Sequence, residues 1–329
     1  MLNKFRKLRA MTFCEALFRV YVFFSPIHTL LNWRLRRKLF NTESRSHLNN
    51  TYLNFTQLEA TFFHVLYCRA FYEQTLNIGD FEWEVNFLGK HLKMPIHSKT
   101  SWLDWNLATA IIGHDIEVKI TYETLLQSDT KPRVFYDVGA NYGTHSLLFR
   151  AHGLDVAAFE PNPSCHEVFR QIFAINRLVP NIVAAAVSDK TGETEFWFPE
   201  CETWLGTMDQ KVKQSLSRGG FELKKIKVAV TTLDDHVRQG AAPPDIIKID
   251  TEGNELKVLQ GALMILEIAR PFIIFESNSG GRDELWRFFR EQRYIIAGLP
   301  VRDLSCVIPL TEKEFVANIE GNFIAISKC

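Results

Sequence analysis

The sequence lacks both the cysteine spacing of a zinc site and the cysteine density of a disulfide-stabilised domain. Six cysteines are spread over 329 residues, and no two of them form a CxxC pair. Zinc sites and disulfide frameworks both need closely spaced or paired cysteines. Scattered cysteines are typical of a reducing compartment. We therefore expect a cytoplasmic protein in which cysteine binds no metal.

Long hydrophobic runs are also absent from the sequence. Residues 16–33 are mostly apolar, but Arg19, Pro26 and His28 interrupt them, and the longest clean run is Val20–Phe24. A helix that crosses a bilayer needs about 20 apolar residues, and a signal peptide needs a small-residue cleavage site that is not evident here. We therefore expect two amphipathic helices joined at Pro26.

The 38 basic and 38 acidic residues cancel, but their distribution is uneven. Residues 1–40 contain nine basic residues and one acidic residue (nine minus one, or +8), so the other 289 residues sum to −8. Basic amphipathic helices are typical of segments that bind an anionic membrane surface. Packing on the main domain is the alternative. We predict peripheral membrane contact through residues 1–40, and we expect no nucleic acid as partner.

Co-sedimentation with anionic liposomes tests this membrane contact. We expect the full chain to sediment with the vesicles. A chain without residues 1–40 should stay in the supernatant, because the truncation removes the +8 charge together with both apolar stripes. Equal sedimentation of the two chains would contradict the prediction.

The remaining composition predicts a folded chain with two parts. Apolar residues make up 46% and charged residues 23%, which is ordinary for a globular protein. The first part, 1–105, is expected to be a mainly helical extension. It includes a helix near 56–72, opened by a capping box, and a small hairpin over 81–96, where apolar and polar residues alternate. Residues 106–329 are expected to form the main domain.

From residue 131 onward, strand and helix patterns alternate. This alternation argues for a mostly parallel sheet with helices on both faces, an α/β fold. Ligands of such folds bind at the carboxyl ends of the strands. The expected strands are 134–138, 156–159, 181–187, 193–198, 225–230, 246–249, 272–275, 294–299 and 322–326, and the expected helices are 122–127, 142–152, 163–176, 255–269 and 283–292.

A glycine-containing turn, Asp137–Gly143, follows the first of these strands and precedes a helix. Gly139 lets the chain turn sharply and approach a ligand, and Gly143 lets the helix start lie close to the strand. The N–H groups of the first helical turn favour a polar or anionic ligand. Glu160 stands 21 residues after Gly139, where a carboxylate can accept hydrogen bonds from both ribose hydroxyls. The sequence therefore predicts a nucleotide-like ligand.

The dinucleotide fingerprint GxGxxG is missing, because Asn141 and Thr144 stand where its later glycines would be. A pyrophosphate cradle is therefore disfavoured. S-adenosylmethionine has no phosphate and needs a tight turn with a carboxylate, such as Asp137, near its amino group. Three alternatives stay open: a turn that binds nothing, an NAD-dependent dehydrogenase, and a degenerate nucleotide-binding module that scaffolds glycan assembly.

Acidic residues stand at the ends of two later strands. Asp250 ends one strand and shares a strand face with Lys248, because side chains alternate with a period of two. Glu252 follows in the loop, and Glu276 ends the next strand. We predict that Asp250 acts as general base toward an acceptor hydroxyl, with Glu276 and Lys248 orienting the acceptor or tuning Asp250. The alternative is that Asp250, Glu252 and Glu276 bind Mg²⁺, which prefers oxygen ligands.

The segment 200–221 is long and of mixed composition, with glycine at 206, 219 and 220. Loops of this kind close over many active sites. We predict a mobile flap over the acceptor, with an ordinary surface insertion as the alternative.

Five blocks of this sequence resemble the FkbM-type methyltransferases: Asp137–Gly143, Phe159–Asn162, Ala186–Asp189, Lys248–Glu255 and Pro271–Glu276. The resemblance covers about residues 115–329. It implies a seven-stranded, Rossmann-like class I methyltransferase sheet, S-adenosylmethionine as methyl donor and usually O-methylation. It also adds Asn141, Asn162 and Ser188 to the residues expected to bind the cofactor.

The resemblance implies an acceptor class but no single acceptor. Acceptors in this family tend to be sugars, glycans or polyketide-like natural products. We therefore predict O-methylation of a sugar or glycoconjugate hydroxyl, with a non-sugar natural product as the alternative. The oligomeric state stays open.

Overall fold

The computed structural model describes residues 81–96, 116–200, 203–277, 281–318 and 321–328. The chain divides into two compact units, 1–116 and 117–329, and each is described by itself. The helices expected in residues 1–40 and near 56–72 lie outside the described residues. Within the described part of the chain, no helix is both long and apolar enough to cross a membrane.

In the first unit, the described residues form the expected hairpin. Its strands are β1 (Phe81–Phe87) and β2 (Lys90–Ile96), which pair antiparallel. The two turn residues, Leu88 and Gly89, both have positive φ, at 46° and 78°. Such a turn matches the right-handed twist of the flanking strands.

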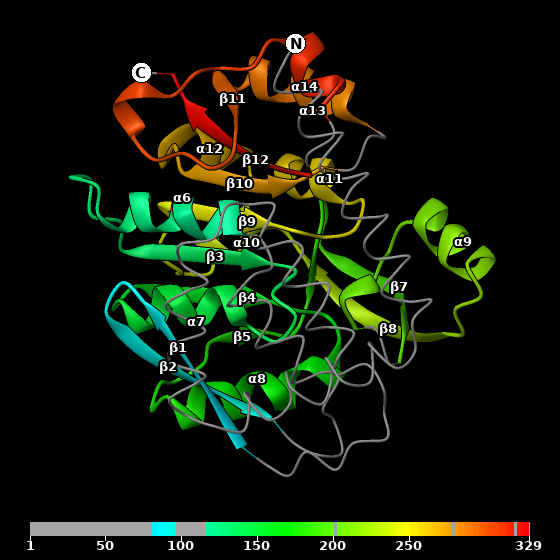
Figure 1. Ribbon diagram of the computed structural model, residues 1–329. Coiled ribbons are helices and arrows are strands. Elements are labelled where there is room, and N and C mark those ends of the chain that lie inside the picture. The colour runs from blue at the N-terminus through cyan, green and yellow to red at the C-terminus, as the bar shows by residue number, and fades with distance from the viewer. Residues whose placement is uncertain (1–80, 97–115, 201–202, 278–280, 319–320, 329) are drawn as a thin grey trace, which may run out of the picture. The chain divides into compact units, whose positions relative to one another are not determined.

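The second unit is built around a seven-stranded sheet with the order β11-β12-β10-β9-β3-β4-β5 (Figure 1). Every neighbouring pair is parallel except those that include β12, which is antiparallel to both β10 and β11. The predicted α/β fold with a seven-stranded, mostly parallel sheet is confirmed. The strands are β3 (Val134–Val138), β4 (Asp155–Phe159), β5 (Ile182–Val183), β9 (Ile246–Ile249), β10 (Phe272–Glu276), β11 (Tyr294–Gly298) and β12 (Asn322–Ser327).

Helices cover both faces of this sheet, because its central strands bury side chains on both sides. On one face, Phe135 of β3 stacks on Phe149 of α7, and Tyr122 of α6 packs edge-on against both rings. On the other face, Tyr136 and Ile247 belong to a core shared with α10, α11, α12 and α13. The helices are α6 (Ile116–Leu126), α7 (Thr144–Ala151), α8 (Pro163–Ile175), α10 (Leu233–Arg238), α11 (Glu255–Gln260), α12 (Leu263–Ile268), α13 (Arg282–Glu291) and α14 (Glu312–Val316).

A second, three-stranded sheet with the order β6-β8-β7 stands beside the carboxyl ends of the main strands (Figure 1). It consists of β6 (Ala186–Val187), β7 (Gly192–Pro199) and β8 (Leu223–Thr231). The connection from β7 to β8 carries a short 3₁₀ turn, η1 (Thr203–Leu205), and helix α9 (Gln210–Arg218). A further 3₁₀ turn, η2 (Leu304–Cys306), follows β11.

Two elements expected as single pieces are divided in the structure. The expected strand 181–187 is β5 and β6, which belong to different sheets, because the chain turns at Ala185, whose N–H donates to Val183. The expected helix 255–269 breaks between α11 and α12 at Gly261. A Cβ atom at Gly261 would lie 2.1 Å from the carbonyl oxygen of Ser188, so the backbones touch here.

This close approach predicts that Gly261→Ala destabilises the fold by about 1–3 kcal/mol, the usual cost of forcing extra atoms into a packed core. The φ of Gly261 is −83°, so the cost is steric and involves no left-handed strain. Gly298→Ala is the matched control, because no atom lies within 4 Å of the added Cβ there. Urea unfolding of both variants measures the difference, and equal midpoints would contradict the prediction.

Candidate functional site

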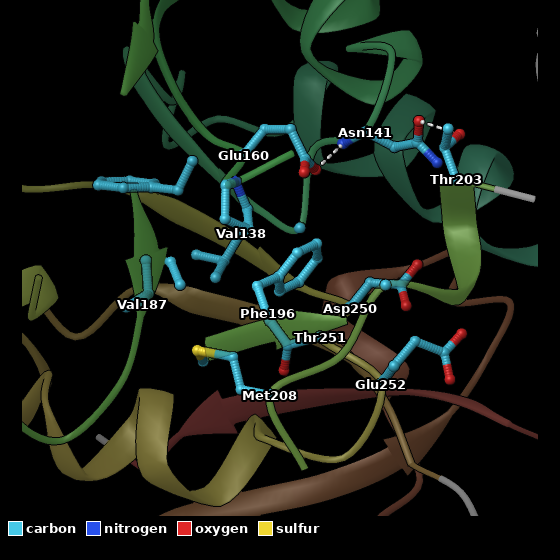
Figure 2. A pocket seen from close by; sticks show the side chains of 15 residues that line it. Val138, Asn141, Glu160, Val187, Phe196, Thr203, Met208, Asp250, Thr251 and Glu252 are labelled. Atoms are coloured by element: carbon cyan, nitrogen blue, oxygen red, sulfur yellow. Dashed lines mark hydrogen bonds between the residues drawn. The ribbon is translucent and has the colours of Figure 1, made fainter. Parts of the chain in front are cut away.

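A solvent-open cavity lies at the carboxyl ends of β3, β4 and β9 (Figure 2). One part of its wall is apolar, from Phe159, Val187, Phe196 and Met208, and the other part carries carboxylates. This is the edge of an α/β sheet where ligands are expected. Its mixed polarity, with an apolar wall and a few polar groups, is typical of a small-molecule site.

Glu160 presents its carboxylate to this cavity from the end of β4. Its Oε2 accepts a hydrogen bond from the N–H of Asn141 at 2.7 Å, and its Oε1 accepts one from the N–H of Asn162 at 2.7 Å. Burial raises the pKa of this carboxyl to about 7, although both backbone donors lower it. Each oxygen keeps acceptor capacity, so the two can receive two further hydroxyls from the cavity.

Asp137 lies beneath the turn and does not line the cavity. Its side chain is fully buried, and Oδ2 accepts hydrogen bonds from the backbone N–H and the hydroxyl of Ser146, at 3.0 and 2.7 Å. Its Oδ1 finds no donor in the described part of the chain. The pKa of Asp137 is raised, chiefly by burial. The carboxylate thus fastens the start of α7 to β3 and keeps one unsatisfied oxygen under the site.

The two glycines of the turn are needed for contacts within the protein. Both have positive φ, 81° at Gly139 and 74° at Gly143, which favours glycine. A Cβ at Gly139 would lie 1.8 Å from the carbonyl oxygen of Asp250, and one at Gly143 would lie 2.2 Å from the ring of Phe169. Gly139 therefore brings the turn Asp137–Gly143, the predicted cofactor turn, directly against the acidic end of β9.

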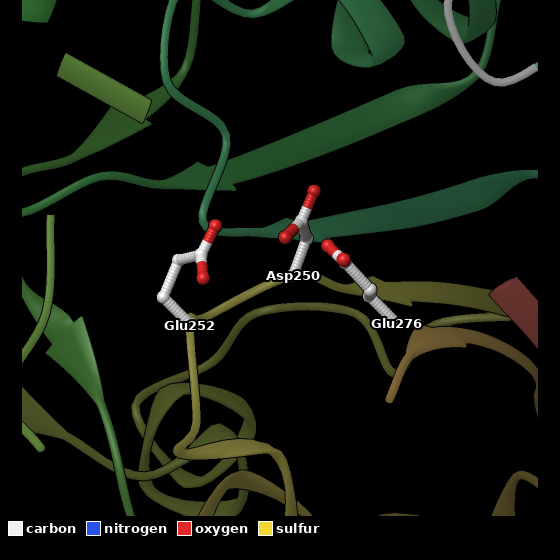
Figure 3. A group of neighbouring side chains, drawn as sticks. All are labelled: Asp250, Glu252 and Glu276. Atoms are coloured by element: carbon white, nitrogen blue, oxygen red, sulfur yellow. The ribbon is translucent and has the colours of Figure 1, made fainter. Parts of the chain in front are cut away.

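Three carboxylates gather at that end, from Asp250, Glu252 and Glu276 (Figure 3). One oxygen from each lies within 4.8 Å of the others. Lys248, buried to 3% exposure, donates to Oδ2 of Asp250 at 2.8 Å. The ammonium compensates part of the negative charge, as buried charges require.

Burial and the closeness of these carboxylates raise the pKa values of Glu252 and Glu276. Burial, and then the nearby charges of Asp250 and Glu255, raise the pKa of Glu252 to about 7. Burial, the charge of Asp250 and a hydrogen bond to it raise the pKa of Glu276 well above its ordinary value, although Lys248 opposes this shift. Carboxylates this close titrate as a group. The cluster therefore binds a proton more readily than separate carboxylates would.

The structure brings together only part of the predicted cofactor set. Gly139, Asn141 and Glu160 line the cavity with Asp250 and Glu252. The other four predicted residues do not line it: Asp137 lies beneath the turn, as described above, and the remaining three have other contacts. Asn162 caps α8 by accepting from Ser164, Ser188 donates to Asp189, and Gly143 packs on Phe169.

Four cavity residues were not predicted individually. Phe196 belongs to β7, and Thr203, Gly206 and Met208 come from the connection between β7 and β8. The sequence indicated only that 200–221 was a flap over the acceptor. The small residues Gly206 and Thr207 were the one sequence feature that could have indicated a close approach of this segment to the cavity. A local pattern does not, however, say which part of the cavity wall a loop forms.

Asn322 and Glu117, which the sequence did not predict as site residues, form a hydrogen-bonded pair beside Glu276. Asn322 opens β12 and is the register partner of Glu276, so both side chains lie on one sheet face. Its Nδ2 donates to the carboxylate of Glu117 at 3.0 Å. Glu117 lies in the first turn of α6. These groups extend the polar surface of the acidic cluster.

Comparison with known proteins gives consistent matches. Residues 137–297 match the family model described as the methyltransferase FkbM domain. The chain is similar to the hexuronic acid methyltransferase AglP of Haloferax volcanii, at 30% identity over 160 residues that cover 47% of this chain and 60% of that protein. It is also similar to the 31-O-demethyl-FK506 methyltransferase FkbM of Streptomyces tacrolimicus, at 29% identity over 152 residues that cover 39% and 58%. The matched part thus spans less than two thirds of these relatives.

Among solved structures, the methyltransferase FkbM from Methylobacillus flagellatus KT aligns at 13% identity with a TM-score of 0.37. The alignment covers 69% of this chain and 54% of that chain.

Proposed function

Residues 137–297 belong to the FkbM methyltransferase family, and on that premise we propose that the chain is an S-adenosylmethionine-dependent O-methyltransferase of a sugar or glycoconjugate hydroxyl. The five sequence blocks all fall within the matched range, so the predicted family resemblance is confirmed. The observation that carries the proposal is that Glu160 and Asp250 line one cavity. A ribose-binding carboxylate and a candidate base thereby meet at one site.

The residues present fit S-adenosylmethionine in three respects. The apolar wall of Phe159, Val187 and Phe196 would hold the adenine ring. The two oxygens of Glu160 would accept hydrogen bonds from the ribose hydroxyls. The carboxylates at Asp250 and Glu252 would face the positive charge of the sulfonium and amino groups.

In the proposed reaction, Asp250, Lys248 and Glu276 have different roles. When bound, S-adenosylmethionine supplies an electrophilic methyl group. Asp250 takes the proton of the acceptor hydroxyl onto its carboxylate as the oxygen becomes nucleophilic. Lys248 holds Asp250 in place through its 2.8 Å contact. Glu276, whose pKa is raised by burial and by the charge of Asp250, lowers the negative charge that the cluster carries.

A sugar acceptor is supported by two observations. The similar protein from Haloferax volcanii is a hexuronic acid methyltransferase. The polar surface that Glu117, Glu276 and Asn322 form beside Asp250 offers several partners for hydroxyl groups. A natural product without sugars stays the alternative acceptor, because the similar Streptomyces protein acts on 31-O-demethyl-FK506.

Two measurements test the proposed function. Isothermal titration should detect binding of S-adenosylhomocysteine, and a labelled-methyl assay on a panel of sugars, hexuronic acids and lipid-linked glycans should show transfer to oxygen. The same assay with EDTA separates this mechanism from Mg²⁺ binding by Asp250, Glu252 and Glu276. Absence of S-adenosylhomocysteine binding would favour a degenerate scaffold module.

Asn322→Ala is expected to act on the acceptor alone. Loss of one hydrogen-bonding side chain contributes about 1 kcal/mol, so the KM for the acceptor should rise about five- to tenfold. The affinity for S-adenosylhomocysteine should stay unchanged, because Asn322 does not line the cofactor cavity. An unchanged acceptor KM would remove Asn322 from the acceptor site.

A further inference from the structure

The segment Thr203–Asp209 touches two loops that are far apart in sequence. Its first residue contacts the cofactor turn, and its later residues contact the loop after β9 that carries Glu252. The segment also closes the cavity over Phe196 (Figure 2). A Cβ at Gly206 would lie 2.4 Å from the ring of Phe196, so the backbone passes directly over that ring.

Thr207 is fixed on every side. Its backbone N–H and carbonyl form a pair of hydrogen bonds with Trp197 of β7, at 2.9 and 3.0 Å. Its hydroxyl donates to the carbonyl oxygen of Glu252 at 3.0 Å and accepts from the N–H of Asp209 at 2.9 Å. The side chain is 1% exposed. Buried hydroxyls with both roles filled are costly to remove, because their partners lose a hydrogen bond without gaining water.

The loop that Thr207 holds is in a rare backbone conformation. Glu252 has a φ of 51° and Gly253 a φ of 101°. A left-handed residue other than glycine persists where surrounding contacts enforce it. The start of α9 lies close to this turn, because a Cβ at Gly253 would lie 3.1 Å from Val212 and 3.5 Å from Asp209.

Thr203 contacts the turn Asp137–Gly143 on the other side of the cavity in a similar way. Its hydroxyl lies 2.7 Å from the hydroxyl of Tyr142 and 3.4 Å from Oδ1 of Asn141. Asn141 is the residue whose N–H donates to Glu160, and it too has a positive φ, 49°. Two threonines of one segment thus hold the two strained residues on either side of the cavity.

We propose that Thr207 is a positioning residue that holds Glu252 and Gly253 in this turn, and thereby keeps the Glu252 carboxylate in the acidic cluster, while Thr203 positions the cofactor turn. The assignment rests on the proposed function, because the two loops are the proposed acceptor and cofactor sides of one site. The two hydroxyls are expected to have different effects. The Thr207 hydroxyl affects turnover, and the Thr203 hydroxyl affects the affinity for the cofactor.

The test compares Thr207→Val, Thr207→Ser and Thr203→Val in the full chain. Valine keeps the shape of threonine, and serine keeps the hydroxyl. Hydrogen–deuterium exchange of the peptide covering 250–256 reports on the turn, because Thr251 and Gly253 donate backbone hydrogen bonds to Glu255 there. Titration with S-adenosylhomocysteine reports on the cofactor side.

In Thr207→Val we expect exchange of that peptide to rise about five- to tenfold, as loss of one hydrogen bond predicts. The affinity for S-adenosylhomocysteine should stay within about twofold. Thr207→Ser should behave as the native protein does. Thr203→Val should show the opposite pattern, with weaker binding and native exchange at 250–256. With any acceptor found in the panel, Thr207→Val should lower kcat without raising the KM for S-adenosylmethionine.

Native exchange in Thr207→Val would overturn the proposal, as would failure of serine to restore it. Indistinguishable behaviour of the two valine variants would also overturn it, because general destabilisation would then explain both. Thr207→Ala is measured beside Thr207→Val and should give the same exchange result. If the native chain does not bind S-adenosylhomocysteine, the proposed function fails, while the exchange comparison still decides the role of Thr207.

Discussion

Asp250→Asn is expected to lower turnover by about 10²–10⁴-fold, the range that a positioned general base contributes. Asparagine keeps the size of the side chain but cannot take a proton from the acceptor hydroxyl. The backbone contacts of residue 250 should survive, because its N–H donates to Val138 and its carbonyl packs against Gly139. The measurement is kcat in the labelled-methyl assay.

The control for Asp250→Asn is Asp283→Asn, a change of the same chemistry on the exposed first turn of α13. It should leave kcat unchanged. Binding of S-adenosylhomocysteine to Asp250→Asn should fall far less than turnover. Near-native kcat in Asp250→Asn would rule out Asp250 as the base and direct attention to Glu252, which shares the cavity.

Glu160→Gln is expected to weaken binding of S-adenosylhomocysteine by about 100-fold or more. The substitution replaces a carboxylate that accepts two backbone hydrogen bonds by an amide with only one acceptor oxygen. Hydrogen bonds to a charged group are worth about 1.5–3 kcal/mol each, and about 2.7 kcal/mol is a factor of 100. Isothermal titration measures the change directly.

The same carboxylate predicts how binding depends on pH. The pKa of Glu160 is raised to about 7 by burial, so below pH 7 a growing fraction of the protein carries it protonated. Ribose hydroxyls donate hydrogen bonds to the ionised form, and binding at low pH must therefore release a proton. The affinity should be constant above about pH 8 and fall toward tenfold per pH unit below about pH 6.

The pH profile of the variant tests the role of Glu160. Glu160→Gln should lose this pH dependence as well as affinity, so a native pH profile in the variant would assign the titration to another group. Glu167→Gln is the matched control, since Glu167 is exposed on α8 and bonds only to Gln171 in the described part of the chain. It should bind S-adenosylhomocysteine as the native chain does.

The sequence by itself determined the type of sheet and which residues stand at the carboxyl ends of its strands. Alternation of strand and helix patterns predicted the parallel sheet, and the sheet brings the carboxyl ends of its strands to one edge. Asp250 follows β9 and Glu276 ends the neighbouring strand β10, so their meeting agrees with the prediction that both stand at strand ends of a parallel sheet. Glu160 followed in the same way from its place at the end of β4.

Only the tertiary structure decided what covers that edge. Thr203 and Thr207 reach the two loops from the connection between β7 and β8, whose path no local pattern gives. Asn322 meets Glu117 across 205 residues of sequence. The separate sheets of β5 and β6 and the break at Gly261 likewise depend on long-range contacts. Local sequence sets backbone preference and periodicity over a few residues, whereas the walls of a cavity depend on side-chain packing between segments that no local pattern relates.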